Sequence, residues 1–120
     1  MKKLNLLSAL IIGCAISSSA MANGGYINNV KITQMINTAG KLYGGCMMQL
    51  TKNISTVNSS CRTNWVTLSC DGQLENSVTQ ASAMWNSAQM AFALDKTIRV
   101  RVSNNKINGY CHADYIRVQN

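Results

Sequence analysis

Cysteine is the residue that most constrains what this chain can fold into. Cys14 lies in an apolar leader segment, and the remaining four are Cys46, Cys61, Cys70 and Cys111. An even number of cysteines in a small exported protein indicates disulfides, each adding about 2–4 kcal/mol to the stability of such a domain. Zinc is the competing interpretation, but the sequence has no C-x-x-C pair, and His112 directly adjoins Cys111. We therefore expect two disulfides and no metal site, with three connectivities open.

The first 22 residues predict export. Met1-Lys2-Lys3 supplies the positive end, residues 4–16 are mostly apolar, and Ala20-Met21-Ala22 matches a signal peptidase site. The apolar run is too short to span a bilayer, so no transmembrane segment is expected. An alternative is a lipoprotein, because Ile11-Ile12-Gly13-Cys14 resembles a lipidation site. We expect a secreted or periplasmic protein whose residues 23–120 form a single domain.

Composition narrows the class of this domain without naming its function. Hydrophobic residues make up 47% of the 120-residue chain, too many for a disordered protein, and the length excludes a large multi-domain enzyme. Charged residues are only 12%, yet the formal net charge is +7. A basic balance of this kind favours acidic partners.

Hydrophobic periodicity predicts five strands and one helix. Alternating or β-branched runs indicate strands over residues 26–36, 42–50, 65–69, 97–102 and 110–118. Residues 51–62 and 103–106 are polar and are expected to form loops, and Asn108-Gly109 is a hairpin turn signal. Ser77 and Gln80 form a capping box that opens a helix of about 17 residues ending near Leu94. Its apolar stripe is Ala81, Met84, Trp85, Ala88, Ala91 and Phe92.

The order of three strands, a helix and two strands is that of the five-stranded OB-fold barrel. Particular residues strengthen this assignment: Val30-Lys31-Ile32-Thr33-Gln34, then Cys46, Cys70 before the helix, and Ile98-Arg99-Val100. In this pattern the chain resembles the binding subunits of bacterial A-B toxins of the subtilase cytotoxin and typhoid toxin type. The ending Cys111-His112-Ala113-Asp114-Tyr115-Ile116 is similar to that of a broader group of short, uncharacterised secreted proteins of Gram-negative bacteria.

The resemblance implies specific pairings and a specific assembly. It pairs Cys46 with Cys70, which leaves Cys61 to pair with Cys111. It implies a homopentameric ring, with the helices around a central pore where a catalytic subunit docks, and a host or cell-surface glycan as ligand. In the sialic-acid-binding relatives a serine holds the sugar at the position of Asn28. This chain departs from those relatives at Asn28, so the sialic acid contact itself is not carried over. Asn28, Asn29 and Lys31 are candidates for a glycan-facing surface, with a solvated strand face as the alternative.

Three arginines alternate with apolar residues on the predicted last strands and form a basic face: Arg99, Arg101 and Arg117. Lys31 on the first strand is a further candidate for this face. Single-stranded nucleic acid binds such faces with the help of stacking aromatics. Aromatic residues are only 6% of the chain, and export separates the protein from most nucleic acid, so we expect no nucleic-acid partner. Acidic glycans, anionic lipid or lipopolysaccharide phosphates, a partner subunit and plain solubilising charge all fit this face.

The residue inventory offers little to an enzyme. The predicted mature chain has one histidine, His112, expected on a partly exposed strand position, and four carboxylates: Asp71, Glu75, Asp95 and Asp114. No nucleophile motif accompanies them, so we expect no catalytic residues and no cofactor. The leading hypothesis is a non-enzymatic toxin-subunit-like glycan-binding module. The alternative is a monomeric periplasmic or surface protein with a structural or partner-binding role.

Native mass spectrometry of the protein exported from its own signal tests these expectations together. We expect a chain that begins at Asn23, with a mass reduced by the hydrogens that four thiols lose on forming two disulfides. A fivefold assembly would favour the toxin-like ring, and a monomer would favour the alternative. Free thiols would contradict the cysteine argument, and a lipid on Cys14 would replace cleavage before Asn23 with the lipoprotein alternative.

Overall fold

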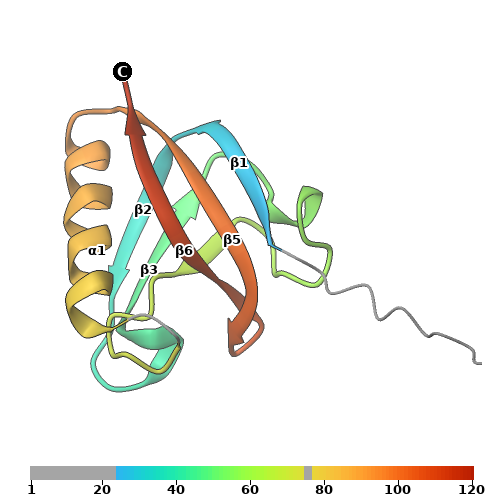
Figure 1. The fold of residues 1–120 in the computed structure, drawn as a ribbon, viewed down its shortest axis with the longest axis vertical. Coiled ribbons are helices and arrows are strands. Elements are labelled where there is room, and N and C mark those ends of the chain that lie inside the picture. The colour runs from blue at the N-terminus through green and yellow to red at the C-terminus, as the bar shows by residue number, and fades with distance from the viewer. Residues whose placement is uncertain (1–23, 75–76) are drawn as a thin grey trace, which may run out of the picture.

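The computed structural model describes residues 24–74 and 77–120, which form a six-stranded sheet with one helix (Figure 1). The strands are β1 (Gly25–Val30), β2 (Ile32–Asn37), β3 (Cys46–Leu50), β4 (Trp65–Thr67), β5 (Thr97–Ile107) and β6 (Tyr110–Gln119). Helix α1 (Val78–Ala93) lies between β4 and β5, and two short 3-10 helices are η1 (Leu42–Gly45) and η2 (Ile54–Thr56). The predicted signal segment, with Cys14, lies outside the described residues.

The two edge strands of the sheet are consecutive in sequence. The spatial order is β1-β5-β6-β4-β3-β2, with β4 and β6 parallel and every other pair antiparallel. Only Lys31 separates β1 from β2, so the sheet has to curl until its two edges nearly meet (Figure 1). The curled sheet encloses a core on its inner face, and α1 packs against β6 and β2.

The prediction of five strands is wrong, because the single strand expected over residues 26–36 is two. The register of β1 against β5 shifts between Ile27 and Val30, and Asn29 has a φ of 51°. Asparagine enters this left-handed region more readily than most residues, so Asn28 and Asn29 form a bulge that turns the chain. Val30 and Ile32 are both buried, as the alternation predicts, but they pair with different neighbouring strands.

Three further strand boundaries differ from the prediction. The strand expected over residues 65–69 ends at Thr67, and Ser69 has a φ of 52°. The second strand begins at Cys46 rather than residue 42, because Tyr43, Gly44 and Gly45 all have positive φ values (57°, 76° and 83°). Residues 103–106, expected as a loop, belong to β5, and a register shift between Val102 and Lys106 absorbs the irregularity. The predicted turn at Asn108-Gly109 is confirmed, with φ of 53° and 84°, as a two-residue type I′ turn requires.

The helix is confirmed, together with its capping box. Ser77 Oγ accepts a hydrogen bond from the Gln80 amide (3.2 Å), and Gln80 Oε1 accepts one from the Ser77 amide (3.3 Å). The buried stripe is formed by Ala81, Ala88 and Ala91, with Met84 and Trp85 packed partly against the core. Phe92 lies outside this stripe and is 46% exposed. The stripe continues from Ala88 to Ala91, three residues later, and the next residue, Phe92, is therefore turned away from the core.

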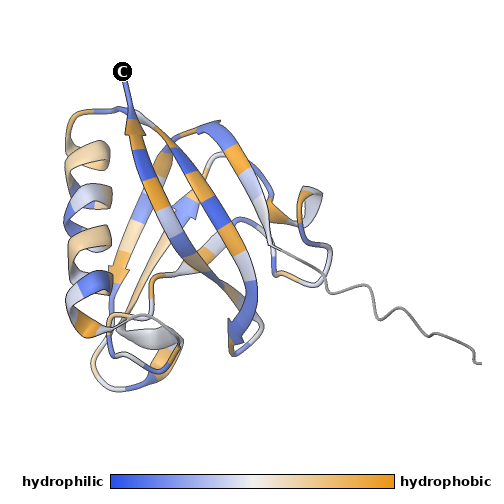
Figure 2. Ribbon diagram, viewed as in Figure 1, coloured by the Kyte–Doolittle hydropathy of each residue, from blue (hydrophilic) through white to orange (hydrophobic). Residues whose placement is uncertain are grey.

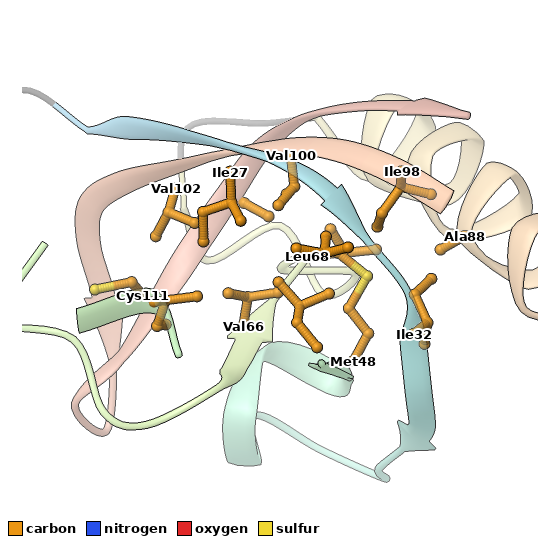
Figure 3. Close-up of a cluster of buried hydrophobic side chains, with 14 of the residues drawn as sticks. Ile27, Ile32, Met48, Val66, Leu68, Ala88, Ile98, Val100, Val102 and Cys111 are labelled. Carbon is orange, nitrogen blue, oxygen red and sulfur yellow. The ribbon is translucent and has the colours of Figure 1, made fainter. Parts of the chain in front are cut away.

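The core is built from inward positions of every strand, including Cys111 and Ala113 at the start of β6. Figure 3 shows Ile27, Met48, Val66, Ile98 and Val100 meeting inside the curled sheet. Along β5 and β6, hydrophobic positions alternate with hydrophilic ones (Figure 2), as expected for strands buried on one face. Burial of these aliphatic side chains contributes about 1.5–3 kcal/mol each.

Two disulfides connect irregular segments of the chain to strands of the sheet. Cys46 at the start of β3 is bonded to Cys70 in the segment before α1, with Cα atoms 5.6 Å apart. Cys61 in the polar loop is bonded to Cys111 on β6, with Cα atoms 5.4 Å apart. Both pairings match those that the resemblance implies, and together they tie the irregular segments to the sheet.

Removing each bridge as a cysteine-to-alanine pair should destabilise the domain to a different degree. The Cys61–Cys111 bridge spans 50 residues and the Cys46–Cys70 bridge spans 24. Loop-closure entropy therefore predicts that each variant loses roughly 3–4 kcal/mol of unfolding free energy. The Cys61→Ala/Cys111→Ala variant should be the less stable of the two by about 0.6 kcal/mol. Urea unfolding followed by tryptophan fluorescence measures both. The reverse order would show that native-state strain or packing, rather than chain entropy, governs these bridges.

Candidate functional site

The described residues form an aromatic pocket of about 130 Å³. Its walls come from five separate elements: β2, η1, β3, β4 and β6. The lining residues are Ile36, Tyr43, Met47, Trp65 and Tyr110. All five side chains are apolar or aromatic, which is the usual character of a small-molecule site with few polar groups.

The pocket lies on the outer face of the sheet. Met48 and Val66 are paired across β3 and β4 and point into the core, so their neighbours Met47 and Trp65 point the other way. Met47 is nevertheless only 2% exposed. An outward residue becomes buried only if something covers it, and here η1 and the start of β6 supply the cover.

Two tyrosines form one wall of the pocket. The rings of Tyr43 and Tyr110 meet edge to face, with centroids 5.4 Å apart and an interplanar angle of 86°. The guanidinium of Arg62 lies over the Tyr110 ring, 5.7 Å from its centroid. An edge-to-face pair adds about 0.5–1.5 kcal/mol beyond its burial. The wall is therefore held by ring contacts as well as by the backbone.

Tyr43 reaches the pocket through an unfavourable backbone conformation. Its φ of 57° is rare for a bulky side chain and costs on the order of 1–3 kcal/mol. The fully buried Thr67 offsets this cost, because its hydroxyl donates to the Tyr43 carbonyl (2.7 Å) and accepts from the Ser69 amide (3.0 Å). Gly44 is required beside it, since a Cβ there would lie 2.6 Å from Thr67 Oγ1.

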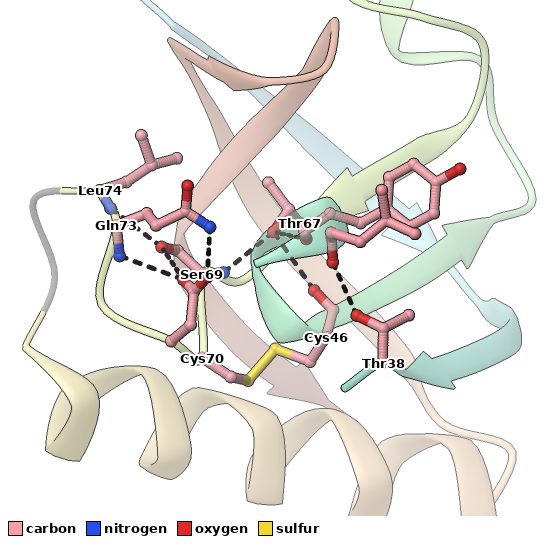
Figure 4. The surroundings of a disulfide bond; sticks show 10 residues. Thr38, Cys46, Thr67, Ser69, Cys70, Gln73 and Leu74 are labelled. Atoms are coloured by element: carbon pink, nitrogen blue, oxygen red, sulfur yellow. Dashed lines mark hydrogen bonds between the residues drawn. A yellow bond between two sulfur atoms is a disulfide. The ribbon is translucent and has the colours of Figure 1, made fainter. Parts of the chain in front are cut away.

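The Cys46–Cys70 disulfide lies in the same hydrogen-bonded cluster. Figure 4 shows Thr67 between the Cys46 carbonyl, 3.2 Å away, and Ser69. Ser69 Oγ in turn accepts from the Leu74 amide at 3.0 Å, and Gln73 Nε2 donates to the Lys41 carbonyl at 2.9 Å. These contacts join the segment before α1 to the segment that carries Tyr43.

The three arginines of the predicted basic face are brought together. Arg99 and Arg117 are direct partners across β5 and β6, and Arg101 is paired with Tyr115. Arg99 lies over the ring of Tyr26, 4.1 Å from its centroid, and Tyr26 contacts Tyr115 edge to face at 5.6 Å. We call these five residues (Tyr26, Arg99, Arg101, Tyr115 and Arg117) the arginine face.

The residues predicted to face a glycan lie at the bulge and at the break between β1 and β2. The Asn28 carbonyl accepts from Lys52 Nζ (2.8 Å), and the Asn29 amide donates to Gln119 Oε1 (3.3 Å). Lys31 Nζ forms an ion pair with Asp95 Oδ2 at 2.7 Å and therefore does not join the arginine face. The contacts of all three belong to the bend, and their role in glycan binding stays a prediction.

His112 is placed differently from the prediction. It is only 1% exposed rather than a surface residue, because its strand position beside Thr67 of β4 is covered on the outer face. Among residues 24–74 and 77–120, no three His, Cys, Asp or Glu side chains group as metal ligands do. Nor is any helix in that part of the chain long and apolar enough to cross a membrane.

Sequence reasoning missed the three aromatic residues of the pocket. Tyr43, Trp65 and Tyr110 lie far apart in the chain, and each has an ordinary local explanation. One signal was available: Trp65 precedes the inward Val66, so a large aromatic ring was bound to lie on the outer face. The partners that surround it depend on the curl of the sheet, which local periodicity does not reveal.

Comparisons with known proteins assign no family to this chain. A scan against models of protein families gives no match, and neither do searches of curated proteins and of solved structures.

Thr67→Val tests whether the buried hydroxyl holds Tyr43 in place. The substitution keeps the shape but leaves the Tyr43 carbonyl and the Ser69 amide without their partner, so we expect a loss of about 1–3 kcal/mol in unfolding free energy. Thr33→Val, at an exposed threonine on β2, is the matched control and should change stability by less than about 0.5 kcal/mol. Equal losses of unfolding free energy in the two variants would show that the Thr67 hydroxyl does not hold Tyr43 in place.

Proposed function

We propose that this protein is an exported, non-catalytic carbohydrate-binding module of the OB-fold type, which holds one sugar ring in the aromatic pocket. The observation that carries the proposal is the convergence of Tyr43, Trp65 and Tyr110 from three separate elements on one small pocket. Two disulfides support a location outside the cytoplasm, since such bonds persist in oxidising compartments.

The strand order supports the OB-fold assignment. If β1 and β2 are counted as two halves of one bent strand, the sheet contains five strands. The bent first strand then pairs with β5 through its β1 half and with β3 through its β2 half. The helix then lies between the third and fourth strands, and the third and fifth, β4 and β6, are parallel. A five-stranded, partly open Greek-key barrel has this arrangement.

The place of the pocket supports a binding role. OB-folds bind oligosaccharides and oligonucleotides on the face of their second and third strands and on two neighbouring loops. Met47 and Trp65 lie on the corresponding strands, β3 and β4. Tyr43 lies in the first of those loops and Tyr110 directly follows the second. On this assignment the pocket lies on the face that OB-folds use for ligands, which supports a binding role.

The chemistry of the pocket favours a sugar without positive charge. Aromatic faces carry partial negative charge and attract the C–H bonds on the apolar face of a sugar ring. The same faces attract cations, but Arg62 already lies over Tyr110, and the chain as a whole carries a formal charge of +7. The Arg62 guanidinium, the phenol groups and the indole N–H are the groups in or beside the pocket that can form hydrogen bonds with sugar hydroxyls.

A second candidate function is protein–protein contact through α1. Its C-terminal part exposes Met90 (50%), Phe92 (46%) and Leu94 (61%), which is unusual for large apolar side chains close together in sequence. The homopentamer and the catalytic partner implied by the resemblance would use such contacts. They stay predictions, and the same residues equally suit a monomeric partner-binding protein.

Sugar binding can be tested on the disulfide-bonded mature protein. A glycan array selects ligands, and calorimetry with the best of them compares Trp65→Ala and Tyr110→Ala with the wild type. Loss of a stacking face should weaken binding about tenfold or more. Phe92→Ala is the matched control, since it removes an exposed aromatic ring outside the pocket and should leave the affinity unchanged. An empty array, or a Trp65→Ala variant that binds normally, would overturn the proposal.

A further inference from the structure

The arginine face contains two like charges opposite each other that no carboxylate of the described residues neutralises. Arg99 and Arg117 are directly opposite each other on antiparallel strands, and like charges at such positions repel. The described ion pairs are Lys31–Asp95 and Arg101–Asp114, so no carboxylate in residues 24–74 and 77–120 pairs with Arg99 or Arg117. Two opposed guanidiniums of this kind are stabilised when an anion lies between them.

The surroundings of the two arginines hold them ready for such an anion. Arg99 is stacked over Tyr26, 4.1 Å from the ring centroid, and its Nε is buried without a hydrogen-bond partner. Tyr26 contacts Tyr115, so the stack is braced from the neighbouring strand. Both arginines project from the long β5–β6 hairpin, the most extensively paired part of the sheet. Little side-chain freedom is left for Arg99 to lose on binding.

From this arrangement we infer that the arginine face is a site for phosphate groups, and that it binds the anionic lipid headgroups of a membrane surface. The planar guanidinium fork matches the geometry of a phosphate group, whose oxygens accept hydrogen bonds from two arginines at once. Arg101 and Arg117 are exposed, and Arg101 follows Arg99 by two residues, so the cations are repeated along the strand. A membrane surface presents many headgroup phosphates side by side, and it can therefore contact several arginines of this face at once.

The tyrosines favour a membrane over a soluble anionic polymer. Tyr26 is 44% exposed beside the arginines, and tyrosine rings settle at the level of lipid headgroups, where one end is apolar and the other is wet. This site differs from the aromatic pocket in residues and in chemistry. The inference therefore does not depend on sugar binding.

Vesicle sedimentation of the mature, disulfide-bonded protein tests the inference. Vesicles of phosphatidylcholine alone are compared with vesicles that also contain phosphatidylglycerol, at low and at high NaCl. We expect binding only to the anionic vesicles and weaker binding at high salt. Arg117→Gln and the Arg99→Gln/Arg117→Gln double variant should each lose about fivefold in affinity per arginine removed.

Control variants separate a site from general charge. Lys41→Gln removes the same charge from an exposed turn away from the arginine face and should bind nearly as well as the wild type. Arg117→Lys keeps the charge but loses the planar fork, and it serves if the glutamine variants fail to fold. It should bind more weakly than the wild type. Trp65→Ala should bind vesicles normally, so failure of sugar binding and failure of this inference are distinguishable.

Several results would overturn the inference. No binding to anionic vesicles would do so, as would equal losses in Lys41→Gln and Arg117→Gln, because the attraction would then follow net charge alone. Binding to polygalacturonate without binding to vesicles would make the partner an acidic polysaccharide. Tight binding of inorganic phosphate without vesicle binding would make it a soluble phosphate compound.

Discussion

The position of one residue, Lys31, governs the shape of this molecule. It is the only residue between β1 and β2, which form opposite edges of the six-stranded sheet, so the sheet is forced to curl around its own core. The bulge at Asn28 and Asn29 supplies the change of direction, and the Lys31–Asp95 ion pair connects the bend to the end of α1. That ion pair is exposed and contributes little by itself. The geometry is maintained by the buried residues on either side, Val30 and Ile32.

Because the curl places the aliphatic positions inside, the residues that alternate with them are left on the outer face and determine what the surface offers. On β3 and β4 these residues are Met47 and Trp65, which η1 covers to form the aromatic pocket. On β5 and β6 they are the arginines, with two tyrosines beside them. The same alternation of inward and outward residues therefore produces two outer surfaces: the uncharged aromatic pocket and the cationic arginine face. The buried Thr67 hydroxyl and the Cys46–Cys70 bridge hold the covering segment in place.

The sequence predicted the local features well, since each depends on residues close together in the chain. The capping box at Ser77 and Gln80, the turn at Asn108-Gly109 and the inward Ile98 and Val100 required only spacing and residue type. The break at Lys31 was missed because asparagine at φ 51° is permitted rather than required. The pocket was missed because Tyr43, Trp65 and Tyr110 come together only through the curl. The arginines were found, but their direct opposition depends on a register that only the structure gives.

The central claim is that the aromatic pocket holds a sugar ring, and nuclear magnetic resonance tests it most directly. The chain has two tryptophans, one in the pocket and one on α1, so their indole N–H signals act as an internal pair of probe and control. The protein would be titrated with the methyl glycosides of galactose, glucose, mannose and N-acetylglucosamine. The account predicts that at least one glycoside shifts the Trp65 indole signal and leaves that of Trp85 in place. A shift at Trp85 alone, or no shift at Trp65 with any of them, would contradict it.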